Sequence, residues 1–401
     1  NFAAGVNAGN SITSGGNYNT VVGDEAGTAI TTGDENTFIG YQSGDANTTA
    51  RYNTAVGKSS LSSTTTGESN VAIGRDALLT NTTGASNTAV GKSALVLSTT
   101  ASNNTAVGYA SLGANTTGAN NAALGREALL SNTTGASNSA FGSTALDANT
   151  TGSFNTALGQ ASLGANTTAD DNTAVGYQAL KLNTTGGANV AIGTYALDAN
   201  TTAGANTGVG YGALTDCTTG FDNTAIGANA GIAVTTGDNN TLLGHDAGRS
   251  GSPGGEINTS NNQVVLGDEN VAGFHAQVSL TVASDQRDKT DFSDLDVGLD
   301  FVNALKPYTY KWDKRAKYGD KDSSDFDLNN LTPDGTHKED WLDIGFKAQE
   351  VEALEKSAGY KIADKTNLVT TLTGDGKQYG MKYEKFVPIL VKALQELSAK
   401  N

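Results

Sequence analysis

The sequence predicts an all-β repeat solenoid, a β-roll or β-helix shaft of 17-residue coils, followed by a small α+β domain that ends in a helix. A short motif recurs every 17 residues, the apolar residues come in pairs too short for helices, and the composition changes sharply near residue 284. The predicted domains are a shaft at 1–248, shaft-closing strands with a linker at 249–283, and a C-terminal domain at 284–401.

The repeat is the pentapeptide pattern Asn-Thr-Ala-Val-Gly, which recurs from Asn19 to Asn240 without insertion or deletion. The glycine four places after the asparagine is present in every copy, from Gly23 to Gly244. Residues 1–5 form one more copy, offset by one extra residue. A fixed period of this length is the signature of a repeat architecture.

Each unit has only two apolar pairs, as in Ala174–Val175 and Ala179–Leu180. A helix needs apolar residues at helical spacing over about ten positions. We therefore expect two short strands per unit, joined by turns at the glycine and at Asn-Thr-Thr-Gly. Such a unit is too small to bury a face alone, so neighbouring units must stack into a solenoid.

Adjacent apolar residues in one strand point to opposite faces, so Ala174 and Val175 require two buried faces. One is the interior of the coil, and the simplest cover for the other is self-association, which predicts a trimeric shaft. Leucine occupies one position in ten successive units, Leu61 to Leu214. The flanking units have glycine there, which indicates that terminal coils pack differently. The asparagine column is expected to form an amide ladder between coils.

Charge and composition exclude several function classes. A net charge of −16 without a basic stripe argues against nucleic-acid binding, and no apolar run is long enough for membrane insertion. Cys217 cannot form an internal disulfide, and His245, His275 and His337 lack metal-ligand spacing. We expect no metal and no cofactor, and the sparse acidic residues of the shaft form no glycosidase pair.

Residues 1–283 carry 7 Lys and Arg with 19 Asp and Glu, whereas residues 284–401 carry 18 and 22, which marks a domain boundary. Before it, 249–255 is expected to be a loop, and 263–267 and 278–283 to be strands. After it, we predict a helix at 299–305 that Pro307 stops, a strand at 308–312, and a final helix. Val387, Leu390, Leu394 and Leu397 give that final helix an apolar stripe suited to packing against copies of itself.

The charged C-terminal domain carries several specific motifs in order. They are SDQRDK at 284–289, GL at 298–299, LKPYTYKW at 305–312, GFKAQEV at 345–351 and YEKFVPILVKALQEL at 383–397. Together they resemble the intramolecular chaperone of phage endosialidases and tail fibres, a self-cleaving serine peptidase family. The shaft layout is similar to the head repeats of trimeric autotransporter adhesins.

The resemblance implies that this domain trimerises, aligns three chains while the shaft folds, and then cuts the chain between Ala283 and Ser284. By the same match Ser284 is the nucleophile, Lys289 the general base, and Asp285 a residue that positions the pair. A lysine serves as a base where burial favours its neutral form. Asp288 stands where family members often have an aliphatic residue, and a carboxylate beside Lys289 works against that role. From spacing alone, Ser284 and Asp285 could equally cap a turn, with Lys289 a surface charge.

The function predicted from these features is that of a structural and host-adhesion fibre of a phage tail. It would be part of the virion, extracellular, a homotrimer, and bound to a host cell-surface glycan or envelope receptor. Because the chain begins at Asn1, we expect a missing N-terminal region to attach it to other tail proteins. The alternatives are a bacterial trimeric surface adhesin and the non-catalytic end of a depolymerase tailspike. The only enzymatic activity expected is self-cleavage.

Overall fold

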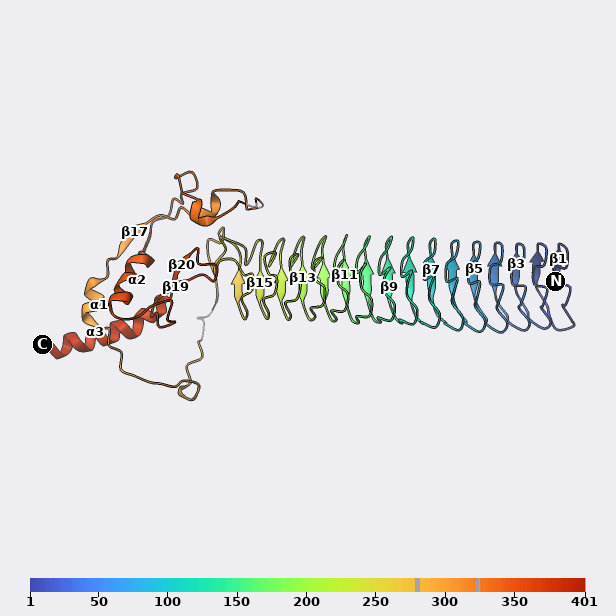
Figure 1. The fold of residues 1–401 in the computed structure, drawn as a ribbon, viewed down its shortest axis with the longest axis horizontal. Coiled ribbons are helices and arrows are strands. Elements are labelled where there is room, and N and C mark those ends of the chain that lie inside the picture. Colours follow the sequence, from blue (N-terminus) through green and yellow to red (C-terminus); the bar gives the residue numbers. More distant parts are fainter. Residues whose placement is uncertain (278–281, 322, 324, 401) are drawn as a thin grey trace. The chain divides into compact units, whose positions relative to one another are not determined.

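A computed structural model describes residues 1–277, 282–321, 323 and 325–400 (Figure 1). The chain divides into two compact units. We call Asn1–Asp246 with Asn258–Val264 the shaft unit, and Ala247–Ile257 with Val265–Asn401 the C-terminal unit. The domain limits inferred from the sequence, at 248 and 283, stay predictions.

Within the described residues, sixteen three-residue strands form one parallel sheet, in which the strands follow one another in sequence order. The strands are β1 (Phe2–Ala4), β2 (Thr20–Val22), β3 (Thr37–Ile39), β4 (Thr54–Val56), β5 (Val71–Ile73), β6 (Thr88–Val90), β7 (Thr105–Val107), β8 (Ala122–Leu124), β9 (Ser139–Phe141), β10 (Thr156–Leu158), β11 (Thr173–Val175), β12 (Val190–Ile192), β13 (Thr207–Val209), β14 (Thr224–Ile226), β15 (Thr241–Leu243) and β16 (Val264–Leu266). Partners lie 17 residues apart, as in Thr156 with Thr173, but Phe2 pairs with Thr20. The predicted solenoid and its offset first copy are confirmed.

The prediction of two strands per coil is wrong. The second apolar pair lies in a turn, because its leucine adopts a left-handed backbone that cannot continue a strand. All ten leucines of this column, Leu61 to Leu214, have φ between 50° and 55°. That conformation costs a leucine about 1–2 kcal/mol. Full burial of the side chain returns about 1.5–3 kcal/mol, so the leucines remain there.

The interior of the shaft unit is filled by two columns of side chains. The middle residue of each strand, such as Ala174, points inward, and the leucine column packs against it with no exposed surface. In the end coils, where glycine replaces leucine, the strand residue is larger. A Cβ on Gly44 would lie 2.6 Å from the Phe38 ring, and one on Gly231 would lie 2.7 Å from Leu242 Cδ1. The expected difference in terminal packing is thus an exchange of volume between the two columns.

The predicted asparagine ladder is present and fully buried. In a representative step, Asn138 Nδ2 donates to Gly152 O at 2.8 Å, and Asn155 Nδ2 donates to Asn138 Oδ1 at 3.2 Å. The same Oδ1 accepts the backbone N–H of Asn155 at 3.0 Å. We call this column the first ladder; it ties the main chain of each coil to a side chain of the preceding one.

A second buried ladder runs through the Asn-Thr-Thr turns. Asn132 Nδ2 donates to Asn115 Oδ1 at 2.9 Å and to Gly135 O at 2.9 Å. Cys217 occupies this register, with Sγ 3.4 Å from Gly220 O. The second ladder therefore accepts a residue other than asparagine, as expected for Cys217.

The C-terminal unit is α+β, as predicted. Its elements after residue 284 are η1 (Gln286–Asp288), α1 (Leu299–Ala304), β17 (Tyr308–Tyr310), η2 (Arg315–Lys317), η3 (Leu328–Asn330), β18 (Asp343–Gly345), α2 (Ala348–Ser357), β19 (Thr370–Leu372), β20 (Tyr379–Met381), η4 (Tyr383–Lys385) and α3 (Phe386–Lys400). β17 pairs antiparallel with β18, and β19 with β20. Their common core contains Val297, Phe301, Val351, Val369, Phe386 and Ile389.

The helices predicted at 299–305 and at the C-terminus are confirmed as α1 and α3, and the predicted strands at 263–267 and 308–312 as β16 and β17. The strand predicted at 278–283 lies mostly outside the described residues. Glu355 of α2 is buried, and its carboxylate accepts the backbone N–H groups of Leu368, Val369 and Thr370. One side chain thus joins α2 to the start of β19.

Candidate functional site

Ser284 and Lys289 lie on either side of η1, the one-turn helix at the start of the family-like segment. This turn reverses the chain, with Lys289 N donating to Gln286 O at 3.2 Å. The reversal brings Lys289 Nζ to 2.6 Å from Ser284 Oγ and to 3.4 Å from Ser284 O. The structure therefore brings together the two residues predicted as nucleophile and base.

Residues 282–290 are all exposed in the single chain. The ammonium group of Lys289 donates to the hydroxyl of Ser284, so this geometry belongs to the protonated lysine. To accept the hydroxyl proton, Lys289 must first lose a proton. Burial in an assembly would favour the neutral form, since desolvation penalises charge.

Asp285 caps η1. Its Oδ1 accepts the backbone N–H of Arg287 at 2.9 Å, and Oδ2 accepts Arg287 Nη2 at 2.6 Å. The hydrogen bonds from the Arg287 side chain and backbone hold the pKa of the Asp285 carboxyl below its usual value. Asp285 thus shapes the turn that carries Ser284 and Lys289, whereas its predicted part in a catalytic site stays a prediction. Asp288 lies inside η1 and is exposed.

The segments before and after Ser284 contact each other within the C-terminal unit. Arg249 Nη2 donates to Lys321 O at 2.5 Å, and the backbone N–H of Glu256 donates to Asp375 Oδ2 at 3.2 Å. Glu269 pairs with Lys321 at 2.5 Å in a nearly buried ion pair. A cut at residue 284 would therefore leave the two pieces joined by non-covalent contacts.

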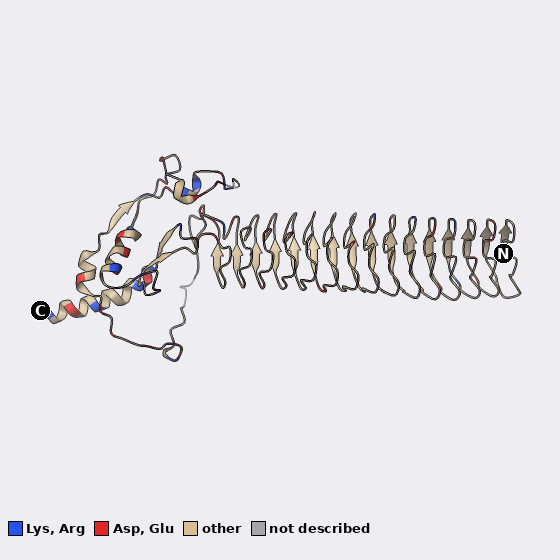
Figure 2. Ribbon diagram, in the orientation of Figure 1, with Lys and Arg blue, Asp and Glu red and all other residues tan. Residues whose placement is uncertain are grey.

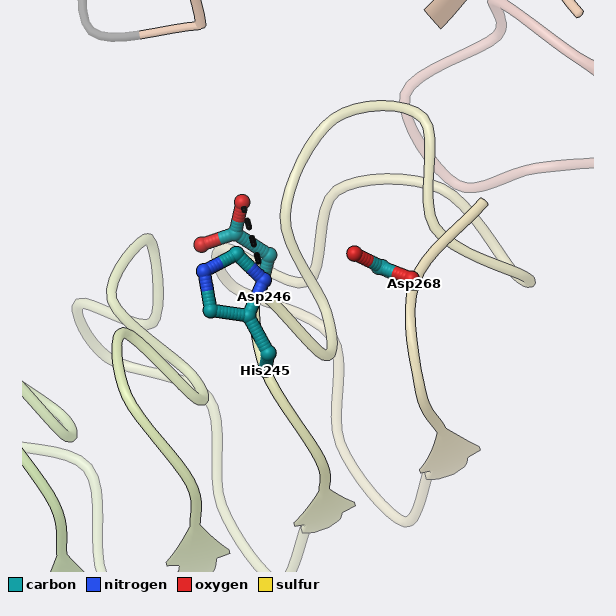
Figure 3. A group of neighbouring side chains, drawn as sticks. All are labelled: His245, Asp246 and Asp268. Carbon is teal, nitrogen blue, oxygen red and sulfur yellow. Dashed lines mark ion pairs between the residues drawn. The ribbon is translucent and has the colours of Figure 1, made fainter. Parts of the chain in front are cut away.

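Figure 3 shows His245, Asp246 and Asp268, which the sequence alone did not single out as a group. His245 and Asp246 follow β15, with Nδ1 of the imidazole 3.7 Å from Oδ2 of the carboxylate. Asp268 follows β16, and its carboxylate accepts hydrogen bonds from the backbone and side-chain N–H groups of Asn270. These contacts account for the geometry of each loop.

An apolar cavity of about 660 Å³ lies in the C-terminal unit, and sequence reasoning did not identify it. Its wall includes Tyr308, Tyr310 and Trp312 at β17, together with Phe346 and Tyr383. The signal in the sequence was the alternation of aromatic residues at 308, 310 and 312. An aromatic wall of this kind suits the side chains of a packed polypeptide segment.

Fold and site define a class: a repetitive β-solenoid shaft joined to an α+β unit whose serine–lysine pair stands at the start of a compact segment. Residues 284–360 match the Peptidase_S74 family, described as the chaperone of endosialidase. This match together with the β-solenoid fits a tail fibre with a C-terminal chaperone domain. No curated protein and no solved structure matches the chain.

The family match supports a role for the C-terminal unit in trimerisation and folding. The matched residues include Ser284, Lys289 and β17 and end at residue 360, before α3. Among the described residues, none of the helices has both the length and the apolarity needed to cross a membrane.

Proposed function

We propose that this chain is a structural and host-adhesion fibre of a phage tail, whose C-terminal domain drives trimerisation and then cuts itself off before Ser284. The observation that carries the proposal is the 2.6 Å contact between Lys289 Nζ and Ser284 Oγ at the first residue of the family match. The attachment site on the host would lie on the shaft.

Two apolar surfaces support assembly with two further copies. In the shaft, the third residue of each strand points outward, which gives a continuous column of Val, Ile, Leu and Phe. Ile73, Leu124 and Leu158 in this column are 40–49% exposed. Burying such side chains stabilises an assembly by roughly 25 cal/mol per Å² of apolar surface, and the column extends over fourteen successive coils from Val22 to Leu243.

The second surface is on α3. Phe386, Ile389 and Ala393 face the core of the unit. On the opposite side, large apolar side chains are 45–65% exposed. They are Val387, Leu390, Val391, Leu394 and Leu397. Their spacing is that of a helix which packs against copies of itself, as the sequence predicted.

The proposed cleavage is a single turnover within the chain. Neutral Lys289 takes the proton of Ser284 Oγ, and the oxygen attacks the carbonyl carbon of Ala283. The bond between Ala283 C and Ser284 N breaks, the amine takes up the proton, and an ester links Ala283 to Ser284 Oγ. Water then hydrolyses the ester, which leaves a carboxylate on Ala283 and restores the hydroxyl of Ser284.

Trimerisation supplies the condition that the single chain lacks. Ser284 and Lys289 are exposed in one chain, where the lysine is a charged donor. Packing of three C-terminal units would remove water from the pair and favour the neutral amine. Cleavage would then follow assembly, and removal of the chaperone would leave a shaft whose stability is kinetic.

The test is the intact mass of the purified chain beside Ser284→Ala and a matched control, Ser293→Ala, which changes another exposed serine of the same segment. Fragments 1–283 and 284–401 are expected in the wild type and the control and should be absent in Ser284→Ala. Lys289→Arg, which keeps the charge, should also stay uncut, and Asp288→Leu should cleave faster. An uncut wild type that sediments as a trimer would refute self-cleavage while leaving the fibre role intact.

A further inference from the structure

One exposed column of the shaft unit differs from the rest of its surface. The residue that follows the conserved glycine of each coil is aromatic or basic in six successive coils: Tyr41, Lys58, Arg75, Lys92, Tyr109 and Arg126. All six side chains are exposed. We call this set the post-glycine column.

The column concentrates positive charge on an acidic shaft. Residues 1–248 contain 6 Lys and Arg and 16 Asp and Glu, and four of the six basic residues lie in the post-glycine column. Residues 41–126 have a net charge of +2, whereas residues 1–40 carry −4 and residues 127–248 carry −8. Figure 2 shows how sparse the charged positions of the shaft are. The basic side chains are therefore gathered in one stretch.

The contacts of the basic side chains divide them into two kinds. Arg75 pairs with Asp76 and Arg126 with Glu127, each at 2.9 Å. Lys58 and Lys92 instead lie over tyrosine rings, with Nζ 5.6 Å from the centroid of Tyr41 and 5.7 Å from that of Tyr109. A cation held over a ring keeps its charge available to an external anion.

This arrangement fits a linear sugar chain that carries carboxylates. Successive side chains of the column are about 4.8 Å apart, one strand spacing, over roughly 24 Å in total. An extended polysaccharide repeats its rings at a comparable distance. Tyrosine rings stack on the apolar faces of sugar rings, and exposed ammonium groups pair with their carboxylates.

We propose that the post-glycine column binds a linear carboxylated polysaccharide laid along the shaft, with Lys58 and Lys92 as the main charge contacts and Tyr41 and Tyr109 as stacking platforms. This inference rests on the proposed attachment function and names the chemical class of its ligand. Because the column lies within a single shaft unit, one chain supplies the whole site.

The test uses the full chain with polygalacturonate as the probe and dextran as its neutral counterpart. Lys58→Ser with Lys92→Ser is compared with Arg51→Ser and Lys181→Ser, which removes the same charge outside the column. Serine already occupies the column at position 143. Affinity for polygalacturonate should fall about tenfold in the column variant and less than about twofold in the control. It should also weaken with salt, and dextran should bind neither protein.

Equal affinities of the two double variants would overturn the proposal, as would binding of dextran as tightly as polygalacturonate. Tighter binding of duplex DNA than of polygalacturonate would overturn the ligand class. A cleaved trimer that fails to bind polygalacturonate refutes this inference alone. An uncleaved monomer that binds through Lys58 and Lys92 refutes the proposed maturation and supports the column.

Discussion

The two asparagine ladders differ in what they hold, and the difference predicts unequal effects of the same substitution. Asn138 of the first ladder and Asn132 of the second are both fully buried and only six residues apart. Asn138 Oδ1 is the acceptor for the backbone N–H of Asn155 at 3.0 Å. Asn132 bonds to the side chains of Asn115 and Asn149 and to Gly135 O.

Asn138→Ser should therefore destabilise its coil more than Asn132→Ser. Both variants lose amide contacts, but Asn138→Ser also leaves a buried backbone N–H without an acceptor, at an added cost of about 1–3 kcal/mol. That corresponds to roughly 5- to 150-fold faster exchange of the Asn155 amide hydrogen through local opening. The second ladder already contains Ser98, fully buried, which indicates that serine fits there.

Hydrogen exchange of the full-length chain, followed by mass spectrometry of peptides covering residues 150–160, measures this difference directly. Exchange in Asn138→Ser should exceed both that of the wild type and that of Asn132→Ser. The same acceleration in the two variants would show that the backbone hydrogen bond contributes nothing beyond the amide contacts, and the reasoning would fail.

Four further outcomes are expected. Leu163→Ala should lower the free energy of unfolding by about 2–5 kcal/mol, measured by urea denaturation, because the side chain is fully buried. Glu355→Ala should cost at least about 3 kcal/mol in tryptophan-monitored unfolding, since three N–H groups lose their acceptor. After cleavage the two fragments should co-elute at low salt and separate at high salt, and sooner in Lys321→Ala, which breaks the pair with Glu269. Burial raises the pKa of the Cys217 thiol to about 11, so alkylation at pH 8 should require unfolding, and stability should fall as the pH rises above 9, where only the unfolded thiol ionises.

Much of the shaft could be predicted because its repeat has no gaps. A constant 17-residue step fixes which side chains stack, so the asparagine ladder and the leucine column follow from the sequence. The pairing of Ser284 with Lys289 could also be anticipated, since a single turn separates them. What could not be anticipated is their exposure, because burial depends on contacts between segments, and for this pair on contacts between chains.

The error on strand number has a physical cause in the leucine column. Ala179–Leu180 has the apolar character of a strand, but Leu180 has a φ of 51°. The signal was present in the end coils, where Gly27, Gly44, Gly231 and Gly248 occupy the same position. Glycine that alternates with leucine in one register indicates a left-handed backbone, with leucine retained where its burial outweighs the strain. The acceptance of a backbone N–H by each first-ladder asparagine has no sequence signal, since any amide ladder has the same pattern of residues.

The uniformity that makes the shaft predictable also makes its assembly ambiguous. Each hydrogen bond of the ladders joins a coil to the next within one chain, so these bonds do not depend on how neighbouring chains are aligned. The outward column varies only slightly from coil to coil, between Val175, Ile192 and Val209 for example. Three chains slipped by one coil would therefore bury almost the same apolar surface. The selection of one alignment must come from a part of the chain that does not repeat. The C-terminal unit is such a part, and its exposed α3 stripe gives three chains a common starting point, which is the physical reason to expect trimerisation before shaft assembly and cleavage after it.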